Sequence, residues 1–194
     1  MAILTFVMFT VWALIRSFMN RPPGDYETEV CDIRLKDQLF DKAIQAANKA
    51  LEKSPNHRGA IMCKALVFIS QKMYTEANQE LDYLINYLET TVKDDDRTGI
   101  GTLAAAYANR GIIKDRNKNY EGALRDYVKA LGIDHEAVAG PGLGTIILNY
   151  KFKSSSVKER ALYLNEQLQL PENERVLSIK ELDEGQVMHK PGKL

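Results

Sequence analysis

Cysteine and histidine, on which most metal sites and many catalytic sites depend, are scarce in this sequence. Only 2 of its 194 residues are cysteine and only 3 are histidine. Cys31 and Cys63 form no CxxC pair, so they show neither the spacing of a zinc site nor the framework of a disulfide-rich domain. We expect two small buried thiols in a reducing compartment. A disulfide between them remains open if the domain faces an oxidising space.

An excess of charge of either sign is also absent. Lys plus Arg and Asp plus Glu both number 26, and the isoelectric point is about 6.8. This balance lacks the basic surface that nucleic-acid binding requires, so nucleic acid is not expected as a partner. With 194 residues, 45% of them hydrophobic, the chain is expected to form one soluble domain with a modest core.

The chain contains no motif of a catalytic, cofactor or metal site. The histidines are scattered, and "HEAVA" at His135 lacks the second histidine of H-E-x-x-H; no G-x-S-x-G nucleophile motif occurs. The glycine-rich stretch Ala139–Thr145 is not followed by the Lys-Ser or Lys-Thr of a phosphate-binding loop, which favours a loop between helices. The acidic run Asp94–Asp96 lacks the alternating ligands of an EF-hand, which favours a solvated loop. We therefore expect no enzyme activity, no catalytic residue, no cofactor and no bound metal.

A long hydrophobic run occurs at the start of the chain. A membrane span needs roughly 17–25 mostly apolar residues, and Ala2–Met19 meets this length with Arg16 near its end. A cleaved signal peptide would begin with positive charge and end in a small-residue cleavage site, and this run has no such start or end. A soluble helix would have a polar face, which this run also lacks. The pattern predicts a transmembrane anchor over residues 1–21.

Three residues are predicted to lie at the membrane interface: Trp12, Arg16 and Arg21. Positive side chains follow the predicted span, and only the amino terminus precedes it. The positive-inside rule then predicts an N-terminus outside and a domain on the cytoplasmic side. The sequence Pro-Pro-Gly at residues 22–24 ends the predicted helix.

An internal repeat organises the remainder of the chain. Ala43, Ala77 and Ala123 stand in the same local pattern, at intervals of 34 and 46 residues. Each has a small residue twelve positions before it, an aromatic residue three before it, and apolar residues seven and eight after it. These places hold, respectively, Cys31, Ala65 and Gly111; Phe40, Tyr74 and Tyr120; Ala50, Leu84 and Ala130; and Leu51, Ile85 and Leu131. Small residues twelve apart let two antiparallel helices approach closely, so the pattern predicts helical hairpins.

The units resemble tetratricopeptide repeats (TPR), 34-residue helix–turn–helix units with small residues at these places and a closing proline, here Pro55 in the first unit. Unit one covers residues 24–57, unit two 58–91 and unit three 104–137, after an insertion at 92–103. The resemblance implies an all-α solenoid of helical hairpins. Four residues depart from the pattern of the family: Glu27, Arg34, Lys114 and His135.

Two further segments follow the repeats. Residues 138–170 are expected to form a degenerate hairpin that caps the solenoid, because Val157, Ala161 and Leu164 have helical spacing. Residues 171–194 form a charged tail that is expected to be partly helical or disordered and to order against a partner.

The resemblance also implies a concave groove lined by the first helix of each unit, the usual binding surface of such solenoids. An acidic stripe of Asp25, Glu29 and Asp32 would favour a basic segment; an ordinary solvated face is the alternative. The apolar Met62, Leu66 and Ile69 suit an apolar peptide, or else belong to the core. The positions that the resemblance assigns to the groove are Asp25, Thr28, Asp32, Leu35, Lys36, Gly59, Met62, Leu66, Ile69, Ser70, Ala105, Ala108, Ile112, Asp115 and Arg116.

The sequence thus predicts a protein-binding module rather than an enzyme. As a membrane-anchored TPR protein it would serve as scaffold, adaptor, assembly factor or accessory subunit of a membrane complex, with a protein or peptide segment in its groove. Clamping of a chaperone C-terminus is not expected, because Thr28 and Asp32 stand where such repeats carry Lys and Asn. Two alternatives stay open: a periplasmic or lumenal TPR protein of envelope or chaperone type, and an enzyme with an unrecognised site.

Overall fold

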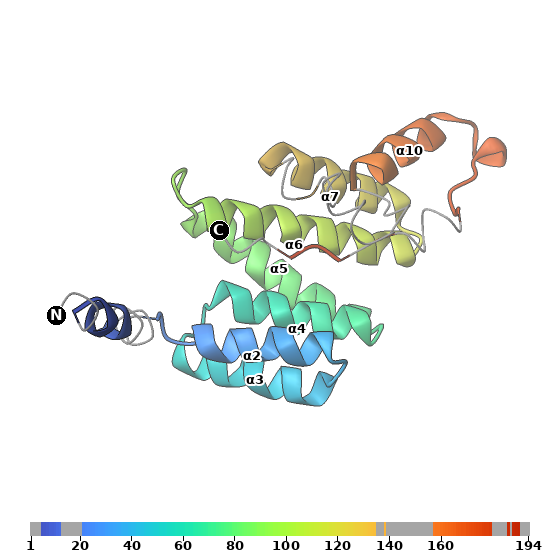
Figure 1. The fold of residues 1–194 in the computed structure, drawn as a ribbon. Helices are drawn as coiled ribbons and strands as arrows, with labels where there is room; N and C mark the ends of the chain where they lie inside the picture. The colour runs from blue at the N-terminus through green and yellow to red at the C-terminus, as the bar shows by residue number, and fades with distance from the viewer. Residues whose placement is uncertain are drawn as a thin grey trace. The chain divides into compact units, whose positions relative to one another are not determined.

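The computed structural model describes residues 5–12, 21–134, 138, 157–179, 186 and 188–190. These parts of the chain are helical with no β-strand, which confirms the all-α class for them (Figure 1). The main helices are α2 (Asp25–Lys36), α3 (Phe40–Lys53), α4 (Arg58–Ser70), α5 (Tyr74–Thr91), α6 (Arg97–Arg116), α7 (Tyr120–Ile133) and α10 (Val157–Gln169), followed by the short 3-10 helix η1 (Glu172–Glu174). The chain divides into two compact units, Met1–Cys63 and Lys64–Leu194.

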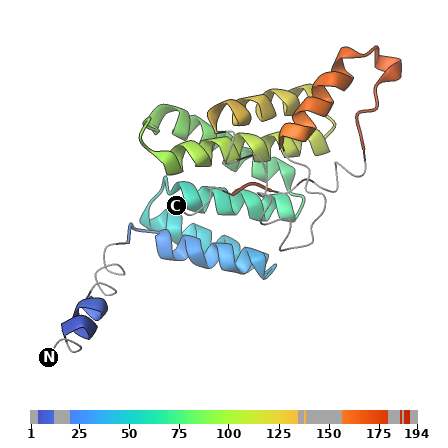
Figure 2. The same ribbon diagram turned by 45° about the horizontal axis from the view of Figure 1, so that its top comes forward.

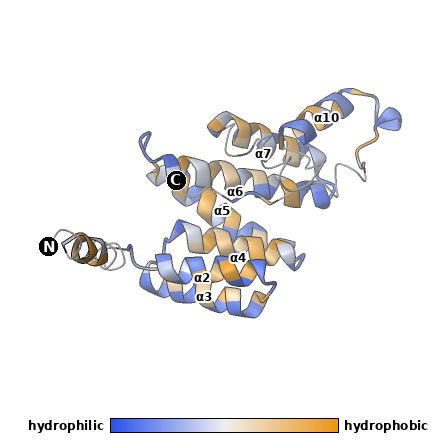
Figure 3. Cartoon of the chain, in the orientation of Figure 1, coloured by the Kyte–Doolittle hydropathy of each residue, from blue (hydrophilic) through white to orange (hydrophobic). Residues whose placement is uncertain are grey.

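The prediction of a membrane anchor with a cytoplasmic domain is wrong. Within the described ranges, no helix is both long enough and apolar enough to cross a bilayer. The helical segment near the N-terminus, described over residues 5–12, is hydrophobic (Figure 3). Trp12, one of the three predicted interface residues, is 51% exposed. Arg21 pairs with Glu29 at 3.1 Å, and Arg16 lies outside the described residues.

Three turns of identical geometry join consecutive helices, at the intervals seen in the sequence repeat. Gln38, Lys72 and Lys118 adopt left-handed φ angles of 58°, 61° and 60°. In each turn this residue donates its N–H to the carbonyl three residues before it, and the next residue donates to the carbonyl five before it, at 2.8–3.0 Å. This is the double hydrogen bond that closes a helix in a Schellman motif. The repeat is therefore a property of the backbone as well as of the sequence.

In the first unit, α2 and α3 pack as a hairpin through small side chains. Ala43, Ala47 and Ala50 of α3 and Cys31 of α2 are fully buried. Cys31 forms a disulfide with Cys63 in the second turn of α4, with the Cα atoms 6.5 Å apart. The expectation of two reduced thiols is therefore wrong. Small residues on α2 and α4 bring the two backbones to the separation that a disulfide requires.

In the second unit, α6 packs against α7 and α5, and α10 packs on α7. α6 begins at Arg97, seven residues before the predicted start of unit three, where Asp96 accepts a hydrogen bond from the Gly99 amide at 2.8 Å. Capping by a side-chain oxygen satisfies one of the free N–H groups at a helix start. The acidic run at 94–96, predicted to be a loop, thus supplies the cap of α6.

The close contact of α6 with α7 depends on Gly111. A Cβ atom at this position would lie 2.6 Å from two ring carbons of Tyr127. The ring is 1% exposed, and its hydroxyl donates to Asp115 at 3.1 Å, so it has no space into which to move. The small position of the repeat is therefore the place where the partner helix lays an aromatic ring across α6.

We expect Gly111→Ala to destabilise the protein by up to about 2 kcal/mol. Alanine gains about 1 kcal/mol of helix propensity, but crowding in a packed core costs about 1–3 kcal/mol. The matched control is Gly132→Ala in α7, where the added Cβ meets no described atom within 4 Å and is expected to stabilise by about 0.5–1 kcal/mol. Urea unfolding of both variants measures the difference, and a stabilising effect of both would contradict the close approach.

Candidate functional site

A short part of the C-terminal tail, drawn in red in Figures 1 and 2, contacts α6 in the second unit. We call this part, Gln186 and residues 188–190, the docked segment. Gln186 contacts Asp115, and His189 contacts Asn109, so the docked segment runs antiparallel to α6. Asn109 and Asp115 are six positions apart, which is about 9 Å along a helix. This is close to the roughly 10 Å that separates residues three apart in an extended chain.

Asn109 holds the backbone of His189 by two reciprocal hydrogen bonds. Its Nδ2 donates to the His189 carbonyl at 2.7 Å, and its Oδ1 accepts from the His189 N–H at 2.8 Å. The side-chain amide thereby pairs with a peptide unit as a neighbouring β-strand would. Asn109 is fully buried, with Ala105 and Ala108 beside it on α6; these small residues let an extended backbone come close. Both hydrogen bonds are made to the main chain of His189 and neither involves its side chain.

Asp115 is the centre of a buried polar cluster that reaches the docked segment. Arg160 of α10 donates to it from Nε and Nη2, both at 2.7 Å, and the Tyr127 hydroxyl donates at 3.1 Å. Gln186 adds a bond from Nε2 at 2.7 Å. Burial, followed by the negative charge of Asp115, raises the pKa of Tyr127 well above its usual value, so the hydroxyl keeps its proton.

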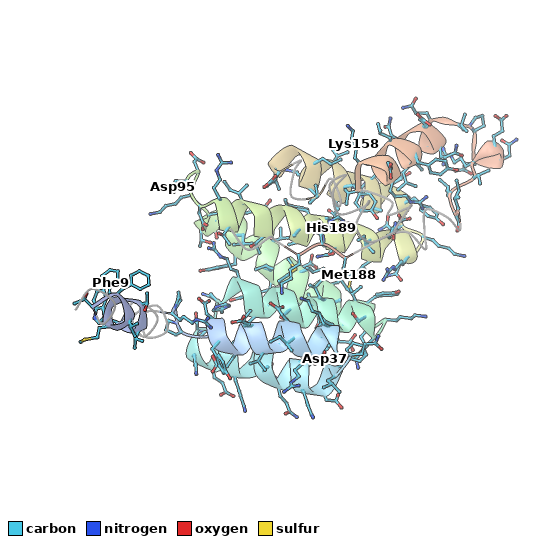
Figure 4. The ribbon with its side chains drawn as sticks, viewed as in Figure 1. Phe9, Asp37, Asp95, Lys158, Met188 and His189 are labelled. Atoms are coloured by element: carbon cyan, nitrogen blue, oxygen red, sulfur yellow. A yellow bond between two sulfur atoms is a disulfide. The ribbon has the colours of Figure 1, made fainter. Side chains whose placement is uncertain are left out.

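A third contact involves the side chain of Met188, which Figure 4 shows next to His189 on the docked segment. Its Sδ lies 3.9 Å from the Ser70 hydroxyl oxygen at the end of α4, and the single proton of that hydroxyl is donated to the Leu66 carbonyl at 2.8 Å. A thioether adapts to irregular apolar surfaces. Ser70, Asn109 and Asp115, which we call the binding face, thus each contact a different residue of the docked segment.

A separate ionic network fixes the position of α6. Arg110 donates two bonds of 2.8 Å to Asp126 of α7 and one of 2.7 Å to Asp82 of α5. Tyr107 donates to Glu89 of α5 at 2.6 Å, and burial together with this carboxylate raises the pKa of Tyr107 to about 12. Successive helical residues point about 100° apart, so Arg110 anchors α6 while the adjacent Asn109 is directed to the docked segment.

The first unit contains an Asp–His–Thr arrangement that bears on the enzyme alternative. His57 Nε2 lies 2.8 Å from Asp25 Oδ1, and Nδ1 lies 3.2 Å from the Thr28 hydroxyl. The Ala60 N–H at the start of α4 also donates to Nδ1, at 3.2 Å. The lone pair that a general base would use to activate Thr28 is therefore engaged with the backbone. This geometry is that of a helix cap held in place by Asp25.

The structure distributes the predicted groove positions among several environments. Asp115 and Ser70 contact the docked segment, whereas Asp25 and Thr28 contact His57. Lys36 and Arg116 are exposed, and Asp32, Leu35 and Gly59 are half-buried. The remaining positions are buried, each at most 3% exposed: Met62, Leu66, Ile69, Ala105, Ala108 and Ile112.

Asn109 was not among the predicted groove residues, although the sequence contains a signal for it. It is the one amide in the run "AAAYAN" of α6, and a polar group among small buried residues needs a hydrogen-bonding partner. The predicted loop Ala139–Thr145 lies outside the described residues. Among the residues that are described, no group of three or more His, Cys, Asp or Glu side chains could hold a metal ion.

No protein-family model matches this chain, and no curated protein matches it either.

Docking of the tail is expected to depend on pH through His189. Burial lowers the pKa of its imidazole from 6.5 to about 4, so only the neutral ring docks. Docking is fully favourable above pH 6.5, weakens as pH falls from there to about 4, and loses about 3 kcal/mol over this range. In an NMR titration we expect the His189 ring to titrate near 4 in the native chain and near 6.5 in an Asn109→Leu variant. The same pKa in both chains would contradict docking of this residue.

Proposed function

We propose that this protein is a non-catalytic interaction module of the TPR type whose binding face holds an extended segment of a partner protein. The observation that carries the proposal is the reciprocal pair of hydrogen bonds between Asn109 and the backbone of His189. A buried side-chain amide that pairs with a peptide backbone is a means of recognising a polypeptide and has no role in acid–base chemistry. The tail occupies this face as a partner segment would.

Repetition supports the TPR assignment within this proposal. The three left-handed turns recur at the 34- and 46-residue intervals of the small and aromatic positions, and stacked repeats of this kind commonly bind peptides on one face. In this role the protein acts as an adaptor or assembly factor. It binds an exposed, extended segment of the partner protein on its binding face and releases the partner when that segment dissociates.

The disulfide supports the periplasmic or lumenal version of this function. Cys31 and Cys63 are both fully buried and bonded to each other, and structural disulfides persist in oxidising compartments. We therefore propose that the module works outside the reducing cytosol. The enzyme alternative receives less support, because the Asp25–His57–Thr28 arrangement is engaged in capping α4.

A peptide selection tests the proposal. In the full chain, His189→Pro removes the N–H that Asn109 accepts and so opens the binding face. From a library of random twelve-residue peptides, this variant is expected to enrich binders. Adding Asn109→Leu is expected to weaken them about 10- to 100-fold, because two hydrogen bonds of about 0.5–1.5 kcal/mol each are lost. An absence of enriched peptides, or peptides indifferent to Asn109→Leu, would contradict the proposal.

A further inference from the structure

We propose that the Asp115–Tyr127–Arg160 cluster is a specificity pocket, selective for a partner segment that carries glutamine three residues before the residue held by Asn109. This inference rests on the peptide-binding function proposed above and names the ligand chemistry of the same face. Asn109 forms hydrogen bonds only with main-chain atoms, which every peptide carries. A contact with a side chain is therefore needed to distinguish one peptide sequence from another. Gln186 makes that contact through its side chain.

The pocket offers acceptors to both protons of the Gln186 amide. Nε2 lies 2.7 Å from Asp115 Oδ2 and 3.2 Å from the Tyr127 hydroxyl oxygen. The Tyr127 proton is directed to Asp115, which leaves its oxygen free to accept from Gln186. An NH₂ group carries two donors, and here each has a partner.

The charge of the pocket selects against both ionic relatives of glutamine. The Asp115 and Arg160 side chains pair at 2.7 Å and are 3% and 1% exposed, so the buried pair is already neutral. A lysine in place of Gln186 would add a positive charge, at a half-buried position, beside a pair that is already neutral, which is costly. A glutamate would bring a carboxylate against Asp115 and lose both donated bonds, which is the larger penalty. A neutral amide of glutamine length meets neither penalty.

Two anchors at a fixed separation also set the register of the segment. Asp115 and Asn109 lie six residues apart on one rigid helix, and their partners Gln186 and His189 lie three apart in the tail. Between them, Met188 approaches Ser70, a contact that an unbranched apolar side chain satisfies. The preferred ligand is therefore an extended segment of the form Gln-x-Met-x, in which the last residue is held by its backbone.

The test measures binding of synthetic peptides to the full chain that carries His189→Pro. The probe is a fluorescent peptide with the sequence of residues 183–194, DEGQVMHKPGKL, compared with versions carrying Gln186→Glu, Gln186→Lys or His189→Pro. We expect the native sequence to bind best, the lysine version to bind several-fold more weakly, and the glutamate version to bind more weakly by about tenfold or more. The proline version is expected not to bind.

Equal binding of the native and glutamate peptides would overturn the pocket and leave the peptide-binding function standing. Failure of every peptide, the native one included, would instead count against the proposed function. A second readout avoids the added peptide: in the full chain, Gln186→Glu is expected to raise hydrogen–deuterium exchange of the docked segment. Gln79→Glu, at an exposed site on α5, is the matched control and is expected to leave that exchange unchanged. Unchanged exchange in both variants would also overturn the pocket.

Discussion

Arg160→Met is expected to lower the free energy of unfolding by about 3–5 kcal/mol, the largest effect of any single substitution considered for this protein. Arg160 supplies two of the hydrogen bonds to Asp115 and a further one, of 2.9 Å, to the Leu177 carbonyl. Both charged side chains are almost completely buried. Removal of the guanidinium leaves a carboxylate buried without a counterion, and breaking a buried pair in this way typically costs 3–5 kcal/mol.

Urea unfolding followed by circular dichroism measures this loss, with Arg125→Met as the matched control. Arg125 is exposed on α7, and its replacement is expected to change stability by less than about 0.5 kcal/mol. The double variant Asp115→Leu, Arg160→Met is expected to be more stable than Arg160→Met alone, because no unpaired charge is then left in the interior. A loss below about 1 kcal/mol for Arg160→Met, or a double variant as unstable as the sum of the single ones, would contradict the buried pair.

Reduction of the disulfide is expected to lower stability by about 3–4 kcal/mol. The bond joins Cys31 to Cys63 across 32 residues, and a crosslink that closes a loop of this length lowers the entropy of the unfolded chain by roughly that amount at 25 °C. For a chain of this size, about 3 kcal/mol corresponds to a fall in Tm of about 6–12 °C. The first unit, which contains the bond, should be the part that loosens first.

Thermal unfolding with and without reductant measures the fall in Tm. The Cys31→Ala, Cys63→Ala double variant is the control: it should melt near the reduced native protein and show no further response to reductant. Intact mass after alkylation under denaturing conditions, without reductant, reports whether the thiols are free. Two alkylated cysteines, together with a Tm that reductant does not change, would contradict both the disulfide and the oxidising compartment proposed from it.

The hairpins were predictable because their determinants are local and periodic. Small residues such as Gly111 and Ala123, twelve positions apart, allow two helices to cross closely. A pair of small residues with this spacing occurs in each repeat of the sequence. The groove register derived from the family resemblance likewise includes Ser70 and Asp115, which do contact the docked segment. The all-α class was therefore predictable from side-chain periodicity, and the family resemblance named two residues that contact the docked segment.

Other features depend on contacts between residues far apart in the sequence. Such contacts cannot be predicted from the periodicity of side chains along the chain. Pairing of Cys31 with Cys63 requires the approach of two helices whose distance is a tertiary property. Docking of the tail includes two hydrogen bonds to the backbone of His189, and bonds to a main chain leave no signal in the sequence. The anchor was predicted from hydropathy alone, and no helix among the described residues is long and apolar enough to cross a membrane.

Hydrogen exchange at one backbone amide tests most directly whether this face holds an extended chain. In the native protein at pH 7.5, the His189 amide, which donates to Asn109, is expected to exchange about tenfold or more slowly than in an unstructured peptide of the same sequence. With Asn109→Leu it should exchange at the unstructured rate while amides inside α3 keep their protection. Unprotected exchange of His189 in the native chain would contradict the binding face, and with it the account of this protein as a peptide-binding module.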